Sequence, residues 1–187
     1  MHTIISSGLV FELNQQNFTA SLCQINKYEK EELFIPESIV YQNDKYEIKR
    51  IKMCVFSKTK NIKSIKFAKN AKIDDFSNSF KSSKIKCITF PLSVPQFEHQ
   101  YSINCDSLTT IRFQEDSQIQ KLCLTLNESL ESINFPSSIK EINQDIFKKC
   151  PKLNQIIISP NNKYYGYIDK NQKMIGKKSN PDLDYFD

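Results

Sequence analysis

Six cysteines are the most reactive side chains of this 187-residue chain, and they stand at positions 23, 54, 87, 105, 123 and 150. A zinc site usually combines cysteines two to four residues apart with nearby histidines. No Cys-x-x-Cys pair occurs, and the two histidines are His2 and His99. The spacing predicts free thiols in a reducing compartment and no metal centre. A cysteine–histidine nucleophile pair stays open, because its members meet only in space.

The remaining motifs do not favour catalysis. Asp74-Asp75 is a pair of carboxylates in a polar stretch, whereas general acid–base work needs carboxylates that face each other in a dry cleft. Gly176-Lys177-Lys178-Ser179 matches the end of a phosphate loop but lacks the upstream glycine. The sequence therefore predicts a protein that is not an enzyme and holds no cofactor and no metal.

The charge is unevenly distributed. Residues 45–86 contain 13 Lys and Arg against three acidic residues, a local net of +10, while the whole chain has a net charge of +5. One interpretation is a solvated, lysine-rich exterior, and the other is an anion-binding patch. The candidate residues of that anion patch are Lys49, Arg50, Lys63, Lys66 and Lys86.

A recurring strand pattern must position these residues. The pattern Ile-x-x-Ile-x-Phe and its variants start at positions 62, 85, 108, 130 and 153, so the interval between successive starts is nearly constant. A period of 20–29 residues with alternating apolar strand positions is typical of a leucine-rich-repeat solenoid. Such units cannot bury their apolar faces alone, so they must stack.

Alternation along each strand separates core residues from surface residues. Ile62, Ile65 and Phe67 are expected to point inward, as are the phenylalanines of the return segment, which removes them from base stacking and makes nucleic acid an unlikely ligand. The outward positions form two rows, which Gln155 and Ile157 continue. The candidate binding residues on this concave face are Ser64, Lys66, Cys87, Thr89, Thr110, Arg112, Ser132 and Asn134.

A second repeated position lies three residues before each start of the strand pattern. It contains small polar residues that can bond buried backbone groups at the tight turn entering the strand. This predicted structural column consists of Thr59, Ser82, Cys105, Asn127 and Cys150. It explains two of the six cysteines without a redox or metal role.

The two ends of the chain depart from the repeat. Residues 9–13 and 18–25 predict a hairpin, and Leu33-Phe34-Ile35-Pro36 is a degenerate first repeat followed by a turn-containing insertion. A second hairpin is predicted after residue 159. We expect a single domain, 1–187, with an N-terminal β cap and degenerate first repeat (1–47), leucine-rich repeats of nearly constant length (48–159), and a C-terminal hairpin cap with an acidic tail (160–187).

The last full repeat reads Leu130-x-x-Ile133-x-Phe135-Pro136, with Ser138-Ile139, Ile142, Phe147-x-x-Cys150 and Leu153 following. It resembles the BspA-like leucine-rich-repeat family of bacterial surface proteins, which is also expanded in some parasitic protists. The opening Ile35-Pro36-Glu37-Ser38-Ile39 and the closing 160–165 are similar too. The pattern departs at 108–129 and at 62–84. The resemblance implies cell adhesion, protein binding or a surface antigen, often extracellular, and no catalysis.

Together these features predict an α/β fold: a right-handed leucine-rich-repeat solenoid of five to six repeats. A parallel β-sheet forms its concave face, β-hairpins cap both ends, and a short helical turn is expected over 141–150. The predicted function is a non-enzymatic protein-interaction or adhesion module that binds another protein or a cell-surface component. The alternative is a binder of anionic glycans or other polyanions through segment 45–86. No signal peptide or membrane span is seen, which favours the cytoplasm, whereas the resemblance favours the cell surface.

Overall fold

The computed structural model describes residues 2–76, 78–93, 103, 105–119, 121–122, 127–142, 150–167 and 175–177. The six strands of the main sheet are β4 (Glu32–Ile35), β7 (Ser64–Phe67), β8 (Cys87–Thr89), β9 (Thr110–Arg112), β11 (Ser132–Phe135) and β13 (Gln155–Ile158). The other strands are β1 (His2–Ser6), β2 (Leu9–Asn14), β3 (Thr19–Ile25), β5 (Ser38–Tyr41), β6 (Asp44–Ile51), β10 (Lys121–Leu122), β12 (Glu141–Ile142), β14 (Tyr165–Tyr167) and β15 (Ile175–Lys177).

Strands and turns make up the described part of the chain, which contains no helix. The predicted α/β class is therefore corrected for these residues. The predicted helical turn over 141–150 begins instead as the strand Glu141–Ile142, and residues 143–149 lie outside the described residues. Accordingly, the described residues offer no helix that is long and apolar enough to cross a membrane.

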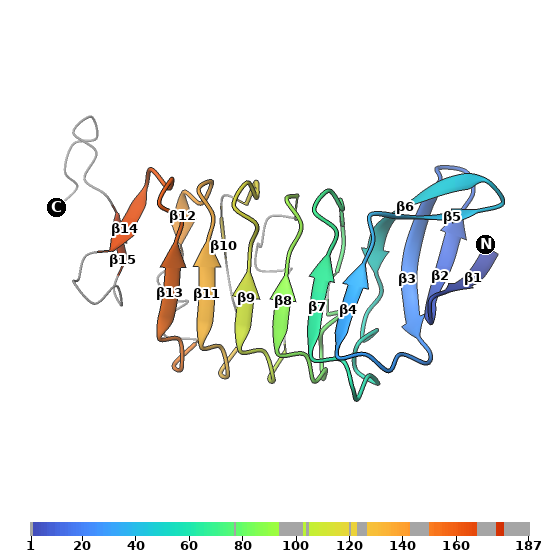
Figure 1. The fold of residues 1–187 in the computed structure, drawn as a ribbon, viewed down its shortest axis with the longest axis horizontal. Coiled ribbons are helices and arrows are strands. Elements are labelled where there is room, and N and C mark those ends of the chain that lie inside the picture. The colour runs from blue at the N-terminus through green and yellow to red at the C-terminus, as the bar shows by residue number, and fades with distance from the viewer. Residues whose placement is uncertain are drawn as a thin grey trace.

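The main sheet is parallel, with strand order β13-β11-β9-β8-β7-β4. Figure 1 shows these strands side by side across the molecule, with β1–β3 at one end and β14–β15 at the other. The register pairs equivalent repeat positions, so that Ile65 lies opposite Ile88, and Ile88 opposite Ile111. The predicted repeat, with one parallel strand per unit, is confirmed.

The backbone just before each strand ties neighbouring repeats together. The carbonyl oxygen of Lys63 accepts hydrogen bonds from the amides of both Lys86 (2.7 Å) and Cys87 (3.1 Å). The same double acceptance recurs along the sheet at Glu31, Lys86, Thr109 and Glu131. Residues Glu31, Lys63, Lys86, Thr109, Glu131 and Asn154 thus form a continuous row at one end of the strands.

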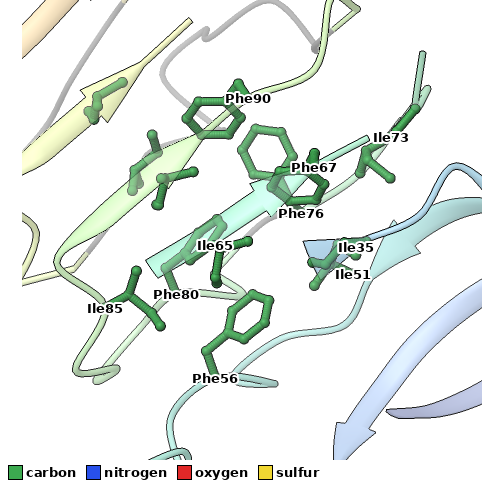
Figure 2. Packing of buried hydrophobic residues seen from close by; sticks show 14 of the residues in the cluster. Ile35, Ile51, Phe56, Ile65, Phe67, Ile73, Phe76, Phe80, Ile85 and Phe90 are labelled. Atoms are coloured by element: carbon green, nitrogen blue, oxygen red, sulfur yellow. The ribbon is translucent and has the colours of Figure 1, made fainter. Parts of the chain in front are cut away.

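Stacked isoleucines and phenylalanines fill the core behind the sheet. Phe90 stacks on Phe67 at a ring-centroid distance of 6.0 Å and on Phe113 at 5.4 Å. Phe56 and Phe80 of the return segments stack at 5.1 Å. Figure 2 shows these rings, except that of Phe113, labelled together with Ile51 and Ile65, which reach the same core from β6 and β7. The predicted inward positions of the repeat 62–80 are all buried.

The N-terminal residues form a separate five-stranded sheet with order β1-β2-β3-β6-β5. The predicted hairpin over 9–25 is present as β2 and β3. The insertion folds as the hairpin β5–β6, whose two turn residues, Gln42 and Asn43, have φ values of 50° and 70°. Two consecutive positive φ values are typical of the type I′ turn, whose twist matches that of the strands it joins.

The C-terminal hairpin β14–β15 is attached to the last repeat through Asn162 and Tyr165. The buried Asn162 donates hydrogen bonds through Nδ2 to the carbonyls of Pro136 and Ile139, both at 3.0 Å. Its Oδ1 accepts hydrogen bonds from the amides of Tyr164 and Tyr165. The hydroxyl of Tyr165 accepts a further hydrogen bond from the amide of Ile142 at 3.1 Å.

Candidate binding surface

The outward residues of the six-stranded sheet form two rows on the side that faces away from the core, here called the outer face. Ser64, Cys87, Thr110 and Ser132 are successive Cα partners across β7, β8, β9 and β11. Lys66, Thr89 and Arg112 are likewise partners, and Asn134 pairs with Ile157 farther along. The structure therefore places the eight candidate concave-face residues on one surface.

Two residues of the outer face were missed in the sequence. Glu32 pairs with Ser64, and Phe34 pairs with Lys66, so both rows begin on β4. The insertion makes the interval between Leu33 and Ile65 longer than that between later repeats, which hides the period. Extending the inward–outward alternation back through Leu33 and Ile35 would have found them. Phe34 is 50% exposed, so the outer face includes a large apolar side chain that is open to solvent.

Four cations lie on or beside the outer face. Lys66 and Arg112 are exposed residues of β7 and β9, while Lys63 and Lys86 occupy the row just before β7 and β8. None of the four forms an ion pair with another residue that the structure describes. Burial raises the pKa of the Cys87 thiol, and the nearby guanidinium of Arg112 partly offsets that rise.

The candidate residues of the anion patch are divided between the two large sheets. Lys49 and Arg50 lie on β6, which belongs to the N-terminal sheet and pairs with β3. Lys49 forms an ion pair with Glu47 at 3.1 Å, and Arg50 pairs with Asp75 at 3.2 Å. Lys66, in contrast, lies on β7, which pairs with β4 and β8 in the main sheet.

The side chain of Asn134 is hydrogen-bonded to the backbone of the preceding repeat. Its Oδ1 accepts a hydrogen bond from the amide of Phe113 at 2.7 Å, and its Nδ2 donates to the carbonyl of Phe113 at 2.6 Å. The Cα partners of β9 and β11 are the two pairs Ser132–Thr110 and Ile133–Ile111. The side-chain amide therefore continues the contact between these strands where the backbone pairing ends.

The residues of the predicted structural column differ in burial. Cys105, Asn127 and Cys150 are buried, and Thr59 is half-buried with its hydroxyl donating to the carbonyl of Phe56 at 2.7 Å. Ser82, however, is exposed and has a φ of 58°. Its place is taken by Ser83, which is buried and hydrogen-bonded to Cys105, with Oγ and Sγ 3.2 Å apart. The stacked rings of Phe56 and Phe80 are 24 residues apart, whereas the strand patterns that start at 62 and 85 are 23 residues apart, so counting three residues back from the strand start gives Ser82 instead of Ser83.

The other chemical candidates are not assembled into a site by the described residues. Burial raises the pKa values of the thiols of Cys23, Cys105 and Cys150, which favours their protonated form over the nucleophilic thiolate. His2 contacts the hydroxyl of Tyr41 at 3.2 Å. His99, Cys123 and residues 178–179 lie outside the described residues.

Comparison with known proteins identifies the repeat. A model of the BspA type leucine rich repeat region matches residues 24–154 in six copies. No match was found among curated proteins.

The fold is shared with one solved structure, and a second is similar over part of this chain. The pneumococcal vaccine antigen PcpA has 15% identity and a TM-score of 0.56; the match covers 95% of this chain and 54% of PcpA, so the chain spans about half of that protein. A leucine-rich repeat protein from Bacteroides capillosus has 17% identity and a TM-score of 0.47, with coverage of 84% and 98%. The family match extends over most of the described repeats, and the chain belongs to the BspA type leucine-rich-repeat family.

Proposed function

We propose that this chain is a non-enzymatic protein-interaction module that binds its partner over the outer face of the six-stranded sheet. The observation that carries the proposal is the register of the first outward row, whose members are successive Cα partners across all six strands: Glu32, Ser64, Cys87, Thr110, Ser132 and Gln155. Family membership supports it, because stacked repeats build extended surfaces of this kind. Adhesion at a cell surface is the specific form that the family resemblance suggests.

The chemistry of the rows favours weak contacts that act together. Ser64, Thr89, Thr110 and Ser132 are small and polar, so they leave the sheet open to an approaching partner and offer hydroxyl groups. Their half-buried side chains contribute little apolar area. We therefore expect low affinity for a single site and stronger attachment when several copies are displayed together.

A separate proposal concerns the domain organisation. We propose that the N-terminal sheet, within residues 1–47, and the C-terminal hairpin, within 160–187, shield the two ends of the repeat stack in one domain. The burial of Asn162 and Tyr165 against the last repeat supports this role. Terminal units of solenoids need such shielding because each repeat otherwise exposes its core to solvent.

Binding of anionic polymers is the second candidate. Lys63, Lys66 and Lys86 favour it, since they lie on or next to two neighbouring strands and form no ion pair with the described residues. The division of the patch weakens it, because Lys49 and Arg50 lie on another layer and are paired with carboxylates.

A pull-down from extracts of the source cells or their hosts tests the proposed surface. The variant Ser64→Arg/Thr110→Arg/Ser132→Arg fills the outer face with long side chains and three added charges. The control Asn61→Arg/Asn70→Arg/Gln118→Arg adds the same charge at exposed turn positions. We expect the first variant alone to lose the captured partner. Equal capture by both variants would show that the outer face is not used.

A further inference from the structure

We propose that the outer face receives an acidic peptide segment that carries an apolar side chain next to its carboxylates. The site extends over β4, β7, β8 and β9 and comprises Phe34, Lys63, Lys66, Lys86 and Arg112. This inference rests on the proposed function and specifies the chemistry of the partner.

The cations are close enough to act on one short segment. Lys66, Thr89 and Arg112 are successive Cα partners, and the amide of Lys86 bonds the carbonyl of Lys63 at 2.7 Å. Neighbouring strands are about 4.8 Å apart, so the four cations occupy a width of roughly 10 Å. Carboxylates are the natural partners of this group, and the planar guanidinium of Arg112 can bind one in a bidentate manner.

Acidic residues limit this cationic centre on both sides. Glu31 and Glu32 precede Lys63 and Ser64 along their rows, and Glu131 follows Thr109. All three glutamates are exposed. A long polyanion lying across the strands would meet these carboxylates after a few repeat units and be repelled there. The arrangement therefore favours a short anionic segment over an extended anionic polymer.

Phe34 indicates that the segment is a peptide. Its ring is 50% exposed, and its Cα partner is Lys66, at the edge of the cationic centre. An exposed aromatic side chain beside charged groups is a typical binding anchor. Covering it removes apolar area from water and excludes water from the adjacent charged groups. A sulfated glycan would match the cations but offers little apolar surface for Phe34.

Fluorescence anisotropy with the full chain and three labelled probes tests the inference. The probes are the peptide Gly-Glu-Glu-Phe-Glu-Glu-Gly, the same peptide with Ser in place of Phe, and a heparin-derived oligosaccharide. We expect the first peptide to bind most tightly, and its affinity to fall as salt rises from about 50 to 500 mM, because salt screens the charges. In Lys66→Gln/Lys86→Gln/Arg112→Gln the affinity for this peptide should fall at least about tenfold, as expected for the loss of several charge-assisted hydrogen bonds.

Two further variants give the test its specificity. Lys58→Gln/Lys60→Gln/Lys81→Gln removes the same charge from exposed positions outside the outer face and should leave peptide binding unchanged. Phe34→Ser should weaken binding of the Phe-containing peptide about fivefold, consistent with the loss of one partly buried aromatic contact, and leave the oligosaccharide unaffected. Thermal unfolding of each variant establishes that it is folded.

The outcomes separate this inference from the proposed function. Equal losses in the two triple variants that remove positive charge, or no effect of Phe34→Ser, would overturn the peptide assignment. Tighter binding of the oligosaccharide than of either peptide would assign the face to anionic glycans. If no probe binds but the arginine variant of the outer face still loses its partner in the pull-down, the inference fails and the proposed function stands. If the arginine variant also retains its partner, both fail.

Discussion

The side-chain amide of Asn134 is hydrogen-bonded to both the amide and the carbonyl of Phe113 in the preceding repeat, at 2.7 and 2.6 Å. Asn134 thereby imitates the backbone of a neighbouring strand. In sequence it has the pattern of an exposed binding residue, and it does lie in the outer row, but its donor and acceptor are already used. Its substitution should therefore affect folding before it affects binding.

Asn134→Asp tests this relationship. The carboxylate can still accept from the amide of Phe113 but cannot donate to the carbonyl, which it would repel. We expect a loss of about 1–3 kcal/mol in the free energy of unfolding, measured by denaturant titration. Ser132→Ala, two residues earlier on the same strand, should change it by less than about 0.5 kcal/mol. Similar values for the two variants would show that the Asn134 contacts do not stabilise the sheet.

Substitution of the adjacent serines Ser82 and Ser83 should have different effects on the free energy of unfolding. Ser83→Ala removes the buried hydroxyl next to Cys105 and should cost about 1 kcal/mol. Ser82→Gly should be neutral or stabilising, because Ser82 has a φ of 58° and glycine adopts that conformation without strain. Chemical denaturation of both variants measures the difference. A larger loss for Ser82→Gly would restore the column position that the strand spacing predicts.

These residues show what the sequence can and cannot specify. The positions of Ile65, Ile88 and Ile111 were predictable, because a constant period with alternating apolar side chains allows one stacking register. Ser83 was not, since the interval from Phe56 to Phe80 is one residue longer than the interval between the corresponding strand starts. Phe34 was hidden by an insertion that breaks the period.

Layer assignment was the harder problem. Arg50 and Lys66 are close to each other in the chain, yet they lie on different layers, because β6 pairs with β3 and β7 pairs with β4. Charge density along the sequence does not tell which layer each strand joins. Only the pairing of β6 with the N-terminal hairpin, a long-range contact, separates the two halves of the anion patch.

The ion pair between Glu12 and Lys52 should make stability depend on pH. The hydrogen bond from Lys52 lowers the pKa of Glu12, against a smaller opposing effect of burial, and the same contact raises the pKa of Lys52. The contribution of Glu12 is present above its unfolded pKa of about 4.3 and is lost as the pH falls through its lower folded value. That of Lys52 is present below about 10.4 and is lost as the pH rises through its higher folded value.

Glu12→Gln removes the acid side of this dependence. Between about pH 6 and pH 3, the melting temperature of the variant should fall less than that of the unmodified chain, because one lowered carboxyl pKa is gone. Glu29→Gln, which replaces an exposed glutamate with no ion pair to another described residue, should follow the unmodified curve. An acid limb of Glu12→Gln that is identical to that of the unmodified chain would mean that the pair is not maintained in solution.

Asn162 should hold the C-terminal hairpin on the last repeat. Its side chain donates to the carbonyls of Pro136 and Ile139 and accepts from the amides of Tyr164 and Tyr165, so Asn162→Ala leaves several buried backbone groups without this partner. We expect a loss of about 2–4 kcal/mol, in the upper range for single substitutions. Hydrogen exchange should show faster exchange at Tyr164 and Tyr165, while β7 and β8 keep their protection, because the segment can open locally. Asn161→Ala is the matched control, since the side chain of the exposed Asn161 contacts Glu115 only at 3.5 Å. Unchanged protection of the two tyrosine amides in Asn162→Ala would show that other contacts fix the hairpin.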